Sequence, residues 1–106
     1  MSGVQILVRH DAELDAYAYF QRISERNPEV GLNFLRAIDE TVEDLALQPL
    51  KGRPRRFRGK DLSNIRSGRV NGSETYLLFY RFSAGTLEIL RLRHGAMKLP
   101  RALRKG

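Results

Sequence analysis

The chain of 106 residues contains no cysteine and no tryptophan. Without cysteine it can form neither a disulfide nor a thiolate metal site, so packing must hold the fold together. No apolar run approaches the roughly 18 residues of a membrane span, and the N-terminus lacks the apolar stretch of a signal peptide. We therefore expect a cytoplasmic protein without a membrane partner, and the length fits a single domain over residues 1–106.

Ligand sets for most catalytic and cofactor sites are also missing. The two histidines, His10 and His94, lie 84 positions apart, so a metal site is not expected. No glycine-rich phosphate loop joins a strand to a helix, and no serine has the context of a nucleophile elbow. The sequence thus indicates neither a cofactor nor a serine hydrolase.

Acidic residues are scarce in only one half of the chain. Residues 1–50 hold 4 Lys/Arg against 9 Asp/Glu, whereas residues 51–106 hold 15 against 3, so a formal charge of −5 precedes one of +12. A charge division of this kind favours a polyanionic partner for the basic half, such as phosphates or an acidic polypeptide. A basic surface that serves only solubility is the alternative.

The first half shows the periodicity of one strand and one helix. Residues 4–8, Val-Gln-Ile-Leu-Val, predict a short strand, and Asp11 is a candidate N-cap for a helix over 12–25. The helical stripe consists of apolar residues at i, i+3, i+4 and i+7: Ala16, Tyr19, Phe20 and Ile23.

A second helix is predicted to begin at Asn27-Pro28 and to end near Gln48, before Pro49. Because the gap between the two helices is short, they should form an antiparallel hairpin that covers one face of a sheet. Five apolar residues continue its stripe: Phe34, Leu35, Ile38, Val42 and Leu45.

A basic segment, Lys51–Lys60, separates the helices from the strands. It carries six cations and no acid, and Pro54 limits any strand near 53–58 to a sheet edge. Arg55, Arg56 and Arg58 could contact phosphates there, or could simply be solvated. Three β-like runs follow, over 62–70, 74–82 and 86–93, and predict an antiparallel meander. Residues from about 98 form a basic tail.

Three residues of the meander are candidates for chemistry. His94 ends the last run beside Arg91 and Arg93, where an imidazole could transfer a proton while guanidinium groups hold a phosphate. Alternatively, His94 only closes the strand end. Arg66 and Arg81 could contact a ligand, or Arg81 could form an ion pair with an acid of the helices. Tyr76, Leu78, Tyr80 and Phe82 alternate as the expected core face.

Taken in order, several short motifs resemble the RelE/ParE toxins of bacterial type II toxin–antitoxin systems. The resemblance covers residues 5–95 and rests on Asp11–Asp15, Asn27-Pro28, Gln48-Pro49, Ile65-Arg66, Tyr80-Arg81-Phe82 and Glu88–Gly95. It implies an α+β two-layer fold in the order β-α-α-β-β-β, with an extra edge strand near 53–58 and the first strand antiparallel to the last. The periodicity alone predicts the same order of elements.

The resemblance also implies a function. His94-Gly95 after Arg91-Leu-Arg93 is similar to the ending of the ParE branch, which poisons DNA gyrase and has no recognised catalytic constellation. The chain departs from this ending after Gly95: it has Ala96-Met97-Lys98 where members of that branch tend to have an arginine and an acid. All four tyrosines precede His94, so the phenol of the RelE-type ribonucleases is missing.

We therefore expect a ParE-like toxin of DNA gyrase, neutralised by a cognate ParD-like antitoxin with an acidic binding segment. The alternatives are a RelE-like, metal-free endonuclease of mRNA on the ribosome and a non-toxic adaptor. No catalytic residue is favoured; the ribonuclease alternative would use His94, Arg66 and Arg81. The candidates for target or partner binding are Arg55, Arg56, Arg58, Arg66, Arg81, Arg91, Arg93 and His94.

Overall fold

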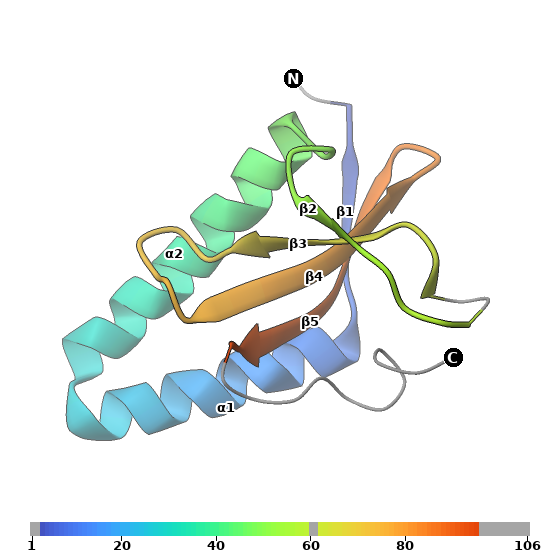
Figure 1. The fold of residues 1–106 in the computed structure, drawn as a ribbon. Coiled ribbons are helices and arrows are strands. Elements are labelled where there is room, and N and C mark those ends of the chain that lie inside the picture. Colours follow the sequence, from blue (N-terminus) through green and yellow to red (C-terminus); the bar gives the residue numbers. More distant parts are fainter. Residues whose placement is uncertain (1–2, 60–61, 96–106) are drawn as a thin grey trace.

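The computed structural model describes residues 3–59 and 62–95, in which two helices and five strands form an α+β fold (Figure 1). The expected basic tail from residue 98 lies outside these residues. The sheet order is β1-β5-β4-β3-β2. The elements are β1 (Gln5–Val8), α1 (His10–Arg26), α2 (Pro28–Leu47), β2 (Arg53–Arg55), β3 (Ile65–Arg69), β4 (Tyr76–Ser83) and β5 (Thr86–His94).

The two helices begin in different ways. The side chain of Asn27 accepts hydrogen bonds from the backbone N–H groups of Glu29 (3.0 Å) and Val30 (3.3 Å), which confirms the predicted start of α2. The helix predicted over 12–25 is present as α1, but its predicted N-cap was wrong, because Asp11 lies in the first turn and Arg9 occupies the N-cap position. Among the described residues no side chain caps α1, and Asp11 acts there as an acid near the positive end of the helix dipole.

The predicted helix hairpin and antiparallel meander are both present. α1 and α2 meet at Asn27, and β3, β4 and β5 pair in antiparallel order. Pro54 lies in β2, which pairs antiparallel with β3 at the sheet edge, as a proline that lacks an N–H requires.

The direction of β1 differs from the expectation, because β1 pairs parallel with β5, from Gln5 opposite Thr86 to Val8 opposite Ile89. Because β2, β3, β4 and β5 alternate in direction, the direction of β5 depends on how many strands follow the helix hairpin. The additional strand β2 adds one reversal, and β5 runs parallel to β1.

Each face of the sheet has its own apolar cluster. In the described part of the chain the helices pack against one face, where buried Leu45 contacts sheet residues that include Leu78 and Tyr80. On the other face Phe79 is buried with Ile65 and Leu90, under Phe57 and Leu62 of the loop after β2. The alternation predicted for β4 is confirmed, with Tyr76, Leu78, Tyr80 and Phe82 on the helix side.

Neither described helix is both long and apolar enough to cross a membrane.

Candidate functional site

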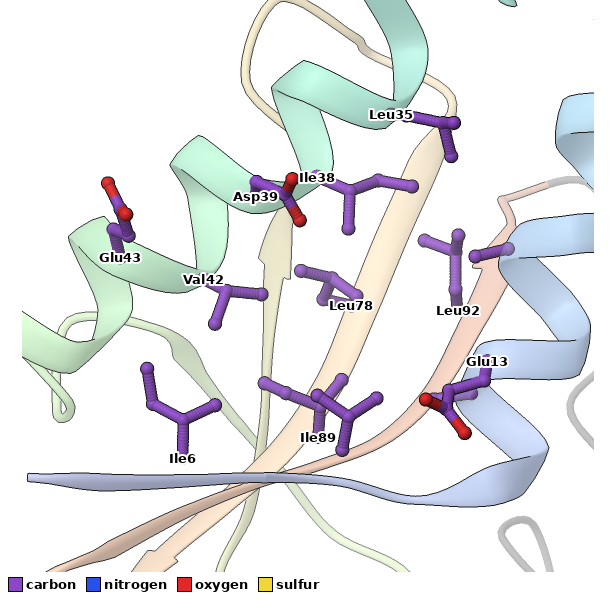
Figure 2. A pocket seen from close by; sticks show the side chains of 13 residues that line it. Ile6, Glu13, Leu35, Ile38, Asp39, Val42, Glu43, Leu78, Ile89 and Leu92 are labelled. Atoms are coloured by element: carbon purple, nitrogen blue, oxygen red, sulfur yellow. The ribbon is translucent and has the colours of Figure 1, made fainter. Parts of the chain in front are cut away.

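An open apolar groove lies between the two helices on the sheet. Figure 2 shows its walls on α1, α2 and β1, with Leu78, Ile89 and Leu92 of the sheet between them. Its volume is about 540 Å³. The remaining lining residues include apolar Ile6, Leu35, Ile38 and Val42 and three carboxylates, Glu13, Asp39 and Glu43. We call this cavity the helix groove.

The helix groove exists because the helices touch closely at the hairpin and diverge from it (Figure 1). At the closed end Gly31 lies directly against Ser24, where any Cβ on Gly31 would collide with the serine side chain. Tyr76 packs there between Tyr19 and Phe34. The centroid of its ring lies 5.0 Å from that of Tyr19 and 4.8 Å from that of Phe34. Toward the other end the gap widens and the apolar sheet surface is left open.

Strand β1 forms the lower wall of the helix groove in Figure 2 and leaves its apolar side chains exposed. The exposed fractions are 45% for Ile6, 52% for Leu7 and 40% for Val8. Ile6 and Val8 line the groove, whereas Leu7 points to the opposite face of the sheet. An apolar strand this exposed at a sheet edge is typical of a surface that a partner covers.

The opposite face of the sheet is rich in arginine. Directly paired residues of neighbouring strands point to the same face, and the register places six arginines on the side away from the helices. We call this the arginine face; its members are Arg53, Arg55, Arg69, Arg81, Arg91 and Arg93.

Asp15 of α1 binds the arginines at one end of this face. Its carboxylate accepts hydrogen bonds from Arg91 Nε (2.7 Å) and Nη2 (2.9 Å), and from the backbone N–H of Leu92 (3.0 Å). Arg93 lies 3.7 Å from the same group. The hydrogen bonds that Asp15 accepts from Arg91 raise the pKa of Arg91, although partial burial acts to lower it. Both arginines therefore anchor α1 to the sheet.

Glu88 of β5 holds two further arginines. Arg81 Nε lies 3.4 Å and Arg9 Nη1 2.9 Å from its carboxylate oxygens, and Arg81 also donates to the carbonyl of Ser63. Of the two alternatives for Arg81, the ion pair is present, but its partner is a neighbouring strand residue and not an acid of the helices. Strand register decides this, because Arg81 and Glu88 are direct partners.

Arg66 and Tyr80 bind the chain that links α2 to β2. Arg66 Nη1 donates to the carbonyls of Leu50 (3.0 Å) and Gly52 (2.9 Å). The Tyr80 hydroxyl donates to the carbonyl of Pro49 (2.7 Å) and accepts from the N–H of Gly52 (3.0 Å). Burial raises the pKa of Tyr80 above its ordinary value. We call this arrangement the linker clamp.

His94 lies at the other end of the sheet. Its backbone N–H donates to the hydroxyl of Tyr19 (3.1 Å), and its ring meets Tyr76 edge to face at 5.2 Å. His94 is paired with Tyr76 of β4, whereas Arg81 is itself a residue of that strand. Tyr76 and Arg81 are five positions apart along β4, so His94 and Arg81 are separated by about 17 Å along the strand. Arg66 points to the opposite face from Arg81. The structure does not bring His94, Arg66 and Arg81 together.

The basic segment surrounds a second hollow. Arg55 lies 5.5 Å above the ring of Phe79 and 3.4 Å from Ser67 Oγ. Arg56 and Arg58 are exposed. A cavity of about 350 Å³ opens where β2 ends and β3 begins, lined by Arg55, Arg56 and Arg66. We call it the corner hollow. Within residues 3–59 and 62–95 no three His, Asp or Glu side chains gather as metal ligands would.

Sequence reasoning identified the arginines but not the groups that bind them. Asp15 and Glu88 appeared only within motifs, and the hydroxyl of Tyr80 was not considered. The apolar groove residues were interpreted only as a strand or as the apolar stripe of a helix. The exposed apolar run of β1 was a usable signal for the groove, because a strand with apolar residues on both faces needs cover on both.

Comparison with known proteins agrees with this fold. Residues 6–99 match the family model of the ParE toxin of the type II toxin–antitoxin system parDE. No curated protein matches the chain. A solved structure titled as the chromosomal ParDE system from P. aeruginosa superposes with a TM-score of 0.68 at 18% identity, covering 89% of this chain and 98% of that one.

A YoeB/ParE toxin from Agrobacterium tumefaciens superposes with a TM-score of 0.56, also at 18% identity, covering 86% of this chain and 98% of the other. At such identities the structures support the fold, while the family match spans most of the chain. This chain therefore belongs to the ParE toxin family of type II toxin–antitoxin systems.

Proposed function

We propose that the chain inhibits DNA gyrase in the cytoplasm by binding, without catalysis, and that a cognate antitoxin neutralises it. The observation that carries this choice over mRNA cleavage is the separation of His94 from Arg66 and Arg81. A metal-free ribonuclease must place a proton-transfer group and a phosphate-stabilising cation around one phosphodiester. Residues that are about 17 Å apart along a strand, as His94 and Arg81 are, cannot contact the same phosphate.

The contacts of the arginines support the same reading. Asp15 holds Arg91, Glu88 holds Arg81, and two backbone carbonyls hold Arg66. A guanidinium already bound by a carboxylate is a poor stabiliser of new negative charge, because the existing pair would have to break first. These arginines act mainly as parts of the scaffold.

The helix groove is the surface we assign to the antitoxin. A toxin of a ParDE system has an antitoxin partner, and the groove offers apolar walls on α1, α2 and β1. An amphipathic segment of the antitoxin would bury its apolar side chains there. Glu13, Asp39 and Glu43 at the groove favour basic residues beside the apolar stripe of this segment. The acidic residues expected of the antitoxin would contact the arginine face from another part of its chain, on the other side of the sheet.

The cellular target can be tested by inducing the protein without an antitoxin. We expect trapped gyrase–DNA breaks and no new ribosome-positioned mRNA ends, scored in the same cells. His94→Ala should retain most of the toxicity, because alanine keeps the backbone hydrogen bond to Tyr19 and loses the ring contact with Tyr76. A general acid or base would instead lose roughly 100- to 10,000-fold in rate.

Cleaved mRNA with intact chromosomes, abolished by His94→Ala, would contradict the gyrase assignment and establish the RelE-like alternative. Normal growth with neither gyrase–DNA breaks nor cleaved mRNA would favour the non-toxic adaptor. Western blotting of His94→Ala against the unchanged protein controls for expression level.

A further inference from the structure

The corner hollow differs from the rest of the arginine face in its charge balance. Arg55, Arg56 and Arg66 line it, and none of the described residues around it is acidic. Arg81, Arg91 and Arg93 instead face the carboxylates of Glu88 or Asp15. The positive charge of the corner hollow is therefore not balanced by a carboxylate among the described lining residues.

The guanidinium groups at the corner keep donors for a ligand. Arg66 uses Nη1 for its two carbonyl bonds, which fixes the side chain and leaves Nε and Nη2. Arg55 is held over Phe79 and makes one hydrogen bond at 3.4 Å, to Ser67. Arg56 is exposed beside them. Arginine side chains that keep donors are suited to an anion with several oxygens, such as a phosphodiester.

Strand β2, at the edge of the sheet, adds a further arginine beside the corner hollow. Arg53 and Arg55 lie two residues apart on β2 and point to the same face, so their backbones are about 6.6 Å apart. That separation is comparable to the distance between neighbouring phosphates of one nucleic-acid strand. Pro54 between them has no N–H to offer a further β-strand, so this edge presents its side chains and not its backbone.

None of the described aromatic residues near the corner, Phe57, Phe79 and Phe82, is exposed as a platform for base stacking. Single-strand binders stack bases on exposed aromatic rings, but Phe79 is 1% exposed and carries Arg55 over its ring. Phe82, the aromatic residue of the hollow, packs against the core on the helix side. Phosphate contacts without stacking are typical of sequence-independent binding to duplex DNA.

We propose that the corner hollow and β2 bind the phosphate backbone of duplex DNA. This deepens the proposed function, because it implies that the toxin touches the DNA of the gyrase–DNA complex in addition to the enzyme. Arg55 and Arg56 contact one phosphate group, and Arg53, which points to the same face as Arg55, contacts the next along the strand.

The test is fluorescence anisotropy of the full-length, antitoxin-free protein with a labelled duplex of about 20 base pairs, from about 50 to 200 mM salt. The double variant Arg55→Gln/Arg56→Gln should lower the salt slope of log K by about 2, one for each lost contact. Its affinity at the lowest salt should fall roughly tenfold. Arg66 is left unchanged because it also holds the linker.

The matched control is Arg22→Gln/Arg26→Gln on α1, which removes the same two charges near the hairpin. The length of α2, about 30 Å, separates those positions from the corner. The control should keep the slope of the unchanged protein. Equal slopes for both double variants, or tighter binding of single-stranded RNA than of the duplex, would overturn the proposal.

A gyrase assay separates this proposal from the proposed function. If the corner variant traps gyrase–DNA complexes as well as the unchanged protein does, the DNA contact has no part in poisoning and the inference fails alone. If the unchanged protein binds duplex DNA through the corner but traps no gyrase, the proposed function fails alone.

Discussion

Asp15 is a partly buried charged residue whose isosteric replacement should destabilise the fold. It is a carboxylate with 11% of its side chain exposed, and it accepts from Arg91 and from the backbone of Leu92. Asp15→Asn keeps the shape but loses the charge and leaves two arginines without their acid. We expect a loss of about 2–3 kcal/mol in the free energy of unfolding, measured by urea denaturation.

The control for this prediction is Asp39→Asn, which makes the same chemical change at an exposed position of α2. It should stay within about 0.5 kcal/mol of the unchanged protein. If both variants unfold at the same urea concentration, the contact between Asp15 and Arg91 contributes nothing to stability and our account of it is wrong.

At the scale of residues, sequence reasoning worked where the deciding partner is near in the chain. Asn27 caps α2 through residues two and three positions away, so its role could be read directly. Asp15 lies 76 positions before Arg91, and no local pattern relates them. The partner of Arg81 was assigned to the wrong element for the same reason, because only strand register brings Glu88 opposite it.

At the scale of elements, the linker clamp predicts a dependence of stability on pH. The folded state favours the neutral phenol of Tyr80, because the group is buried and donates to Pro49. Its pKa is therefore higher when folded than the unfolded value of about 10. Below that pH the stabilisation is complete, and it is lost as the pH rises past 10, because the unfolded chain releases its proton first.

Tyr80→Phe tests the clamp by thermal unfolding between about pH 9 and 11, a range that brackets the unfolded pKa. It should cost about 1–3 kcal/mol at neutral pH, because the buried N–H of Gly52 loses its acceptor. The decline of stability above pH 10 should also become shallower, though burial raises the pKa of Tyr76 as well and part of the decline remains. Tyr17→Phe, at an exposed position, is the control. An equally steep decline in Tyr80→Phe would contradict the role of the clamp.

Elements with their own local signals were predicted within a few residues. The helix hairpin followed from the apolar stripes and Asn27-Pro28, and Pro54 placed β2 at an edge. The direction of β1 was wrong because it depends on how many strands follow the hairpin. The helix groove was not predicted, since the angle at which two helices diverge is set by contacts such as Gly31 against Ser24.

At the scale of the whole molecule, the two faces of the sheet should respond differently to the antitoxin. Ile6 lines the helix groove, and its neighbour Leu7 is similarly exposed on the other side of β1. We expect Ile6→Gln to weaken antitoxin binding roughly tenfold, because it places an amide in an apolar contact. Leu7→Gln should have a smaller effect. Calorimetric titration with the purified antitoxin measures both, and equal losses would remove the groove from the interface.

The charge division seen along the sequence becomes a division in space. The acidic half supplies α1 and α2, and with them the carboxylates beside the groove, whereas the basic half supplies the arginine face. Sequence counting could establish the two charges. Only the fold shows that they lie on opposite sides of one sheet, so that a partner which meets both surfaces must carry both signs of charge.

The parallel pairing of β1 with β5 also determines when during translation the sheet can be completed. Gln5 must wait for Thr86, which is 81 positions later, and a ribosome needs about 4–16 s for that length. The helices can form within about 1 μs, but Asp15 also waits for Arg91. A nascent chain that stops before β5 has an unpaired first strand and an unpaired Asp15. Among the described strands β5 is synthesised last, so a chain released before it lacks the partner of β1 and the groups that bind Asp15.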